Sequence, residues 1–150
     1  MHLAQASVDD PIIARLLEFH HRNMLEVSPP GTAYAFDLDR MRSSDIRIFG
    51  AWNDGQLLAV GALRTHSEFA EIKSMRTLPE HGGKGIGKAL LDLLLKEASN
   101  LGFDLVKLET GISAPFEPAN RLYRAAGFSE IGPFAGYTDN GDNRFYELKL

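Results

Sequence analysis

Apolar and polar residues follow helical spacing in three parts of the chain. Residues 11–27 form the first part, behind Asp10 as a cap and Pro11 at the first helical position. Residues 85–100 repeat the spacing most regularly, and Gly102 supplies a stop after them. The third part, residues 115–128, ends near Gly127. These patterns predict three amphipathic helices.

Short β-like runs lie between the predicted helices. Residues 46–53 and 56–65 flank Asn53-Asp54-Gly55, which favours a tight hairpin. Further strands are predicted at residues 3–7, 69–77, 103–110 and 143–150. Residues 28–36 predict a loop that borders a pocket, and a short helix is expected around residues 37–43. Strands that come first in hairpins and later alternate with helices predict an α/β (α+β) fold, a mixed sheet with helices on its faces.

Composition narrows the class of protein. The 150 residues, 44% hydrophobic and 24% charged, predict one globular domain over residues 1–150. The absence of cysteine excludes disulfides and thiolate metal sites. No apolar run reaches the length of a membrane span, no secretion signal is recognised, and the net charge of −4 gives no general attraction to nucleic acid. We therefore expect a cytoplasmic protein without membrane or nucleic-acid partners.

The stretch "HGGKGIGKALL", residues 81–91, looks like a phosphate-binding loop that opens a helix. A Walker A loop would need Ser or Thr where Ala89 stands, and a dinucleotide fingerprint would need a third glycine where Leu90 stands. A flexible loop that only caps the helix is the plainest alternative. Each glycine whose backbone freedom is not needed costs about 0.5–1 kcal/mol of stability relative to alanine, so four glycines in six positions argue against it. A third kind of loop with this look binds the pyrophosphate of acetyl-coenzyme A through consecutive backbone N–H groups and a helix N-terminus.

The chain resembles the GNAT superfamily of acetyl-CoA-dependent N-acetyltransferases over about residues 57–128. "GGKGIG" matches both glycines of the motif [QR]-x-x-G-x-[GA], although Gly82 replaces the first Gln or Arg. "FEPANRLYRAAGF" matches five positions of N-x-x-A-x-x-L-Y-x-x-x-G-F, but Phe116 stands in place of the asparagine and Asn120 is four residues out of register. "FAEI" lies as far before the glycine loop as in the histone acetyltransferase branch.

The resemblance implies a mixed, mostly antiparallel sheet that splays between its fourth and fifth strands, where acetyl-CoA binds. Met75 and Thr77 would contact the pantetheine arm through their backbones, with the Met75 N–H near the thioester carbonyl. The glycine loop would bind the pyrophosphate. Its implied cofactor-binding residues are Gly82, Gly83, Lys84, Gly85, Ile86, Gly87 and Lys88.

The resemblance also suggests catalytic residues. Glu71 is the candidate base for the acceptor amine, with Glu109 as its substitute; the alternative is an exposed glutamate paired with Lys73. Tyr123 is the candidate donor of a proton to the coenzyme A thiolate, and the alternative is a packed aromatic ring.

A hairpin closed through residues 66–69 would place Arg64 opposite Glu71, with Lys73 further along the same face. We expect one of these cations, more readily Lys73, to bind an anionic group of the substrate; the alternative is a solvated salt-bridge cluster.

These inferences predict an N-acetyltransferase for a small or amino-acid-like amine. The alternatives are acetylation of a protein N-terminus or lysine, and a non-catalytic coenzyme A-binding module. No metal is expected, since the histidines lack ligand spacing, and "GYTDNGDNRF" is expected to be a hairpin turn. A homodimer is left open.

Overall fold

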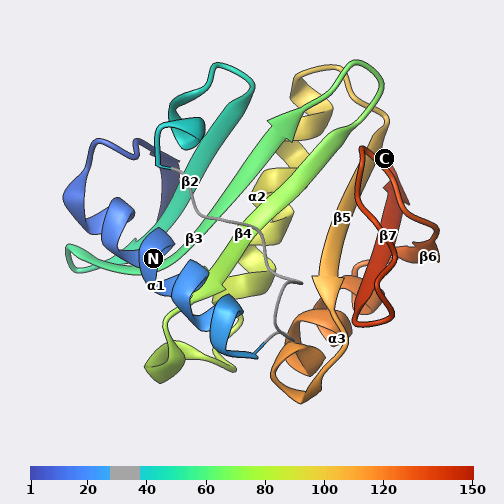
Figure 1. Cartoon of the computed structure of the whole chain (residues 1–150). Coiled ribbons are helices and arrows are strands. Elements are labelled where there is room, and N and C mark those ends of the chain that lie inside the picture. Colours follow the sequence, from blue (N-terminus) through green and yellow to red (C-terminus); the bar gives the residue numbers. More distant parts are fainter. Residues whose placement is uncertain (28–37) are drawn as a thin grey trace.

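The protein, a computed structural model that describes residues 1–27 and 38–150, is built around a seven-stranded sheet (Figure 1). The strand order is β1-β2-β3-β4-β5-β7-β6, and within the described residues β4 and β5 are the one parallel pair. The strands are β1 (His2–Ala6), β2 (Ile46–Asn53), β3 (Gln56–Thr65), β4 (Ala70–Thr77), β5 (Leu105–Gly111), β6 (Ser129–Ile131) and β7 (Asn143–Lys149). The predicted mixed, mostly antiparallel sheet is confirmed.

Helices cover both faces of this sheet (Figure 1). One face packs against α1 (Pro11–Val27), and the opposite face packs against α2 (Ile86–Asn100) and α3 (Glu117–Ala125). Three single turns of 3-10 helix are η1 (Arg40–Arg42), η2 (Pro79–His81) and η3 (Ala114–Phe116). Burial on both faces explains why β3 is almost continuously apolar.

The local signals for turns and caps are confirmed where the structure describes them. The Ile12 N–H donates to Asp10 Oδ1 over 3.0 Å at the start of α1. Asp54 and Gly55 both have positive φ, 48° and 79°, as the tight β2–β3 turn requires. The predicted loop at residues 28–36 lies outside the described residues, and the short helix expected around residues 37–43 is observed as η1.

The sheet opens between β4 and β5. The two strands pair over three positions, from Ala70 opposite Val106 to Ile72 opposite Leu108. Beyond them, β4 continues to Thr77 and β5 to Gly111 without pairing to each other. The expected splay between the fourth and fifth strands is therefore confirmed, and it leaves backbone groups of β4 facing the gap.

A β-bulge in β4 exchanges the faces of its side chains. Ser74 has a φ of 56°, and the β3–β4 register shifts opposite this point. Before the bulge, Glu71 lies on the α1 face. After the bulge, Met75 lies on the α2 face, where its Sδ packs so close to Gly61 that a Cβ on that glycine would approach it to 2.7 Å. Arg76 in turn points to α1, so the regular alternation of side chains between the two faces of β4 is interrupted at the bulge.

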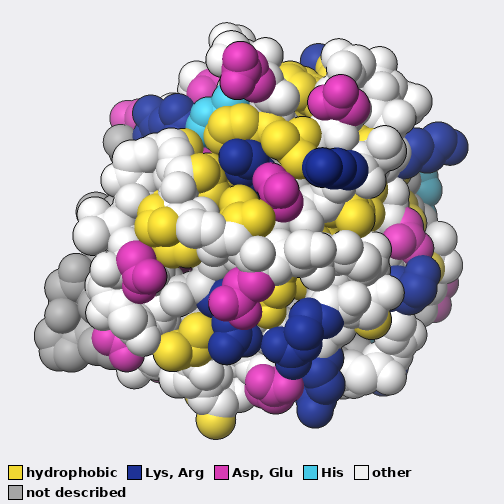
Figure 2. Space-filling model, turned by 90° about the vertical axis from the view of Figure 1, so that its right-hand side faces the viewer, with side chains coloured by type: hydrophobic (Ala, Val, Ile, Leu, Met, Phe, Trp, Pro, Cys, Tyr) yellow, Lys and Arg dark blue, Asp and Glu magenta, His cyan; other side chains and the backbone are white. Residues whose placement is uncertain are grey.

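The C-terminal part adds one strand that the sequence pattern did not predict. Three residues of β6 pair antiparallel with β7, and residues 132–142 connect the two strands. The expected hairpin turn at residues 136–145 is instead part of this longer connection, and its last three residues belong to β7. Figure 2 shows side chains of both charges interspersed with apolar ones on the side of the molecule that it presents. Among the described residues, no helix combines the length and apolar character of a membrane span.

Candidate active site

The glycine loop forms an open cradle at the N-terminus of α2. Gly83 and Gly85 have positive φ, 76° and 80°, and Gly85 is the residue before the helix. A Cβ at either position would have no neighbour within 4 Å, so the loop faces open space. The first N–H groups of a helix lack intrahelical acceptors and carry its positive dipole end. The predicted residues thus form a cradle that fits a pyrophosphate.

The charged side chains of this loop already have neighbours. Lys84 Nζ lies 3.3 Å from His81 Nδ1, and Lys88 Nζ donates to Asp92 Oδ2 over 2.8 Å. The Lys88 side chain is 71% exposed, so this pair contributes little to stability and leaves the ammonium free to turn toward an anion. The backbone of Gly82 has a φ of −62°, a conformation that any amino acid can adopt.

Met75 and Thr77 lie on the stretch of β4 that has no β5 partner. A Cβ on Gly87 would lie 3.6 Å from Thr77 Oγ1, which places the end of β4 against the start of α2. The unpaired end of β4 and the first turn of α2 therefore lie next to each other, and the role of Met75 and Thr77 in binding the pantetheine arm stays a prediction.

Glu71 is buried, not exposed. Its side chain is 2% accessible, and both carboxylate oxygens have partners. Oε1 lies 2.9 Å from His66 Nε2, and Oε2 accepts a hydrogen bond of 2.6 Å from the Tyr137 hydroxyl. Lys73 Nζ lies 3.6 Å from Oε2 and donates to the Tyr137 oxygen over 3.0 Å. The alternative was an exposed glutamate paired with Lys73. The pairing with Lys73 is observed, but the predicted exposure of Glu71 is wrong.

The register predicted for Arg64 and Lys73 is confirmed, but their partners differ. Arg64 is opposite Glu71, yet its Nε donates to Asp45 Oδ2 over 3.1 Å. Lys73 instead approaches Glu71, and its side chain is 30% exposed. Of the two predicted substrate-binding cations, Lys73 is the one that lies beside the Glu71 carboxylate.

Glu109 lies on β5 directly after the last residue paired with β4. Burial raises the pKa of the Glu109 carboxyl, and the nearby negative charge of Glu71 acts in the same direction. A hydrogen bond from Asn143 and the charge of Lys73 oppose this rise in pKa. Glu71, Lys73 and Glu109 therefore share the α1 face at the point where the sheet opens.

Tyr123 lies in α3 with its ring 6% exposed, packed against Phe128 and Tyr146 at centroid distances of 5.8 and 6.2 Å. Burial, with a smaller contribution from Tyr146, raises the pKa of the Tyr123 phenol well above its usual value. A phenol is protonated at neutral pH even at its usual pKa, and the rise makes it a weaker acid. The packed aromatic ring of the alternative is observed, and the catalytic role of the hydroxyl stays a prediction.

Asn120 has a structural role that sequence reasoning did not assign. Its Nδ2 donates to the carbonyl oxygens of Gly111 and Phe116 over 2.9 and 3.0 Å, and its Oδ1 accepts 2.8 Å and 3.1 Å hydrogen bonds from Tyr146 and Arg144. The buried amide thus joins the end of β5 to α3 and β7.

Sequence reasoning also missed His66 and Tyr137. A signal existed for His66, because a turn through residues 66–69 already brings it near Glu71. None existed for Tyr137, which is 66 residues from Glu71 along the chain.

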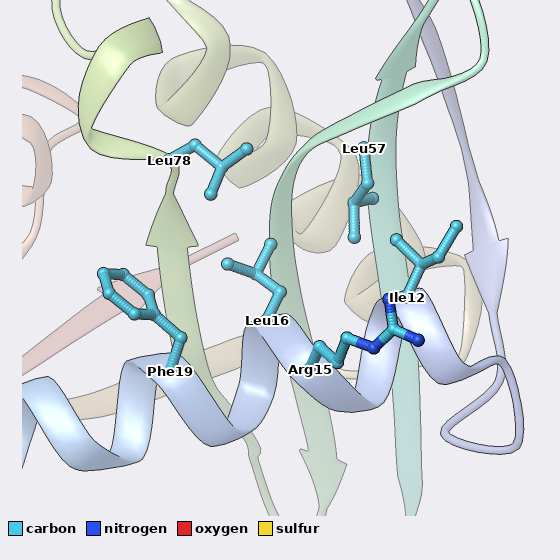
Figure 3. Close-up of a pocket in the computed structure, with 6 residues that line it drawn as sticks. All are labelled: Ile12, Arg15, Leu16, Phe19, Leu57 and Leu78. Atoms are coloured by element: carbon cyan, nitrogen blue, oxygen red, sulfur yellow. The ribbon is translucent and has the colours of Figure 1, made fainter.

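An apolar groove of about 200 Å³ lies elsewhere on the α1 side of the sheet (Figure 3). It is lined by Ile12, Arg15, Leu16, Phe19, Leu57 and Leu78. None of the predicted site residues lines it. Within residues 1–27 and 38–150, no group of three or more potential ligands is placed to hold a metal ion.

Comparisons with known proteins agree with this geometry. The model of the acetyltransferase (GNAT) family matches residues 13–128. The uncharacterized N-acetyltransferase YsnE of Bacillus subtilis (strain 168) is 35% identical over the full length of both chains. The IAA acetyltransferase of Azospirillum brasilense is 30% identical and covers 99% of this chain and 97% of its own.

A solved structure shows the same fold. It is yncA of Salmonella typhimurium, a putative acetyltransferase with its cofactor acetyl-CoA, with 21% identity and a TM-score of 0.73 over 100% of this chain and 94% of its own. Family match, relatives, fold and glycine cradle lead to one conclusion. The chain belongs to the acetyltransferase (GNAT) family and is an acetyl-CoA-dependent acetyltransferase.

Proposed function

We propose that the protein transfers the acetyl group of acetyl-CoA to the primary amine of a small molecule that also carries a carboxylate. The observation that carries this proposal is the pair of Lys73 and Glu109, a cation and a carboxyl on one face where β4 and β5 separate. An amino-acid-like acceptor has one group for each. The name of the Azospirillum brasilense relative, which specifies IAA and no protein, supports a small acceptor.

The residues around the opening fit acetyl-CoA, which supplies a thioester-activated acetyl group when bound. The amides at the start of α2 and the loop before it would hold the pyrophosphate. Met75 and Thr77 would offer backbone groups to the pantetheine arm from the unpaired part of β4. Tyr123, protonated at neutral pH, would give a proton to the departing thiolate.

The acceptor class is tested with a panel scored by thiol release. The panel holds amino acids, the amines that result from their decarboxylation, and peptides with a free N-terminus or lysine. We expect the wild type to prefer carboxylate-bearing small amines. Preferred turnover of peptides would overturn the small-molecule acceptor, and stabilisation by coenzyme A without thiol release on any amine would point to a non-catalytic binding module.

Lys73→Met tests the group that reads the carboxylate. The preference is the ratio of kcat/KM for the carboxylate-bearing amine to kcat/KM for its decarboxylated analogue. Hydrogen bonds to charged groups contribute about 1.5–3 kcal/mol, so this ratio should fall by about tenfold or more in Lys73→Met. Lys96→Met removes an exposed cation from α2, on the opposite side of the sheet, and should keep the preference. Equal ratios in wild type and Lys73→Met would show that the carboxylate is bound elsewhere.

A further inference from the structure

Arg76 is a half-buried cation on the part of β4 that has no β5 partner. It comes four residues after Ile72, the last β4 residue paired with β5, and it points to the α1 face. Burial lowers the pKa of the Arg76 guanidinium, and within the described residues no negative charge opposes this effect. Removing a charge from water without an opposite charge costs free energy. A cation in this environment therefore indicates an anion that joins it on binding.

Three side chains of α1 hold the Arg76 guanidinium in place. Its Nε donates to His20 Nδ1 over 2.9 Å, and its Nη2 donates to Asn23 Oδ1 over 2.7 Å. The centroid of the Phe19 ring lies 5.8 Å from Arg76 Cζ, and Figure 3 shows this ring pointing from α1 toward Leu78. Burial lowers the pKa of His20 to about 3, so all three partners are neutral at pH 7. They fix the direction of the guanidinium without offsetting its charge.

The far end of the guanidinium is open to a ligand. A guanidinium has five N–H donors in one plane, and the bonds to His20 and Asn23 use two of them. In the described part of the chain, no hydrogen bond uses the N–H groups of Arg76 Nη1. Asp45 Oδ1 is the one buried side-chain nitrogen or oxygen atom there that lacks a hydrogen bond, so Nη1 is accessible to solvent. Parallel N–H groups of Nη1 and Nη2 match the two oxygens of a carboxylate.

Arg76 lies away from the cradle that fits the pyrophosphate. The cradle stands at the N-terminus of α2, and α2 covers the face of the sheet opposite to α1. Lys73 instead lies on the same face as Arg76, because the bulge at Ser74 adds one residue between them. Their Cα atoms are at most about 11 Å apart, since each residue of an extended chain spans at most about 3.6 Å. Arg76 thus lies on the side of the sheet where the acceptor is proposed to bind.

The two cations differ in how far their charges are already offset. Lys73 Nζ lies 3.6 Å from Glu71 Oε2, and its charge also acts on the Glu109 carboxyl. Among the described residues, Arg76 has neutral partners only. An acceptor with one carboxylate at Lys73 would leave the Arg76 charge unpaired, whereas an acceptor with two carboxylates would pair with both cations.

We propose that Arg76 binds a second acidic group of the acceptor, so that the acceptor is an amine with two carboxylates, such as an amino dicarboxylic acid. One carboxylate lies at Lys73, and the other lies at the free end of the Arg76 guanidinium. This proposal rests on the acetylation of a carboxylate-bearing amine proposed above. It makes His20 and Asn23 positioning residues, because they direct the guanidinium without contacting the acceptor.

The test compares acceptors that differ in one charge. Free glutamate and glutamine have nearly the same size, as do aspartate and asparagine, but the amides lack the second negative charge. The selectivity is the ratio of kcat/KM for the diacid to kcat/KM for its amide, measured by thiol release. A hydrogen bond to a charged group is worth about tenfold or more. We expect a wild-type selectivity of at least about tenfold in one pair, and a selectivity within about twofold of unity in Arg76→Met.

Three further variants separate binding of the acid from the attachment of α1. Arg76→Lys keeps a positive charge but loses the planar pair of donors, so it should retain part of the selectivity. Asn23→Leu removes a contact that directs the guanidinium and should lower the selectivity by less than Arg76→Met. Arg121→Met removes an exposed cation from α3, on the opposite face of the sheet, and should keep the full selectivity. A purely structural role of Arg76 would lower kcat/KM for diacid and amide by the same factor.

Binding without turnover gives an independent measurement. Glutarate has two carboxylates and no amine, and its monoamide has one carboxylate and nearly the same size. With coenzyme A present, glutarate should raise the Tm of the wild type more than the monoamide does. The difference should vanish in Arg76→Met and remain in Arg121→Met.

Each outcome decides one of the two proposals. If the wild type acetylates no amine, amine acetylation is wrong, and the Tm difference for glutarate alone decides whether Arg76 binds an acid. If the wild type acetylates amines, the absence of selectivity in both pairs, or equal selectivity in wild type and Arg76→Met, overturns the second acidic group. A smaller Tm shift with coenzyme A in Arg76→Met would assign this cation to a phosphate of the cofactor and also overturn it. If Arg76→Met does not fold, Arg76→Lys measures the same ratio.

Discussion

At the scale of single residues, the predicted catalytic role of the Tyr123 hydroxyl can be tested separately from the packing of its ring. The ring is packed between Phe128 and Tyr146, and phenylalanine would keep that packing. Tyr123→Phe therefore removes the hydroxyl that is predicted to protonate the thiolate and little else. We expect turnover to fall much more than coenzyme A affinity, measured by thiol release and by calorimetric titration. Turnover within about twofold of wild type, less than ~0.4 kcal/mol of barrier, would show that water protonates the thiolate.

The residues of the site were predictable to different degrees for a physical reason. The position of Glu71 opposite Arg64 followed from the hairpin, because antiparallel neighbours are fixed by a short turn. The partner of Arg64 did not follow, since Asp45 lies before β2 and is brought near by folding. Tyr137 reaches Glu71 from a segment 66 residues away, and no local pattern encodes such a contact.

At the scale of elements, the bulge at Ser74 decides which residues of β4 serve which face. Before the bulge, Glu71 and Lys73 point to the α1 face; after it, Met75 and Thr77 point to α2. A regular strand would put Met75 on the same face as Lys73. The sequence pattern predicted the strand and the family resemblance implied its splay. Neither predicted this exchange, because a bulge adds one residue without a compositional signal such as glycine.

The glycine cradle also belongs to this scale, and it offers a matched pair of substitutions. Gly85 and Gly55 have nearly the same φ, 80° and 79°, and neither would bring a Cβ within 4 Å of another atom. Gly85→Asp and Gly55→Asp therefore cost similar backbone strain, but only Gly85→Asp puts a carboxylate into the cradle.

We expect coenzyme A to raise Tm in the wild type and in Gly55→Asp, and to produce no shift in Gly85→Asp. Thermal unfolding with and without coenzyme A measures both. An undiminished shift in Gly85→Asp would locate the pyrophosphate away from the loop.

For the whole molecule, the helices and a mixed sheet with helices on its faces could be predicted because periodicity, caps and hairpin turns all agreed. The presence of β6 could not be predicted, since a strand of three residues, none of them buried, carries almost no periodic signal. Asn120 was out of register with the family motif, and its buried hydrogen bonds to Gly111 and Phe116 show that this asparagine joins the C-terminal half of the fold.

The attachment of α1 to the sheet predicts how the whole fold responds to acid. Arg76 Nε donates to His20 Nδ1 over 2.9 Å, and its Nη2 donates to Asn23 Oδ1 over 2.7 Å. Burial, and then the charge of Arg76, lower the pKa of His20 to about 3, against about 6.5 in an unfolded chain. The unfolded state therefore binds the proton first as pH falls, so this stability is present above pH ~6.5 and is lost between pH ~6.5 and ~3.

Between pH ~7.5 and ~5, His20 should thus lower the free energy of unfolding by up to about 2 kcal/mol. Urea unfolding of the wild type and of His20→Gln at the two pH values measures this loss. Glutamine can still accept from Arg76 but does not titrate, so the variant should lose about 2 kcal/mol less than the wild type over this range. Above pH ~7.5 the two proteins should respond to pH in parallel, because His20 is neutral in both states there. If the two proteins lose the same free energy by pH ~5, His20 is protonated without unfolding, and the contact between α1 and Arg76 opens in the native state.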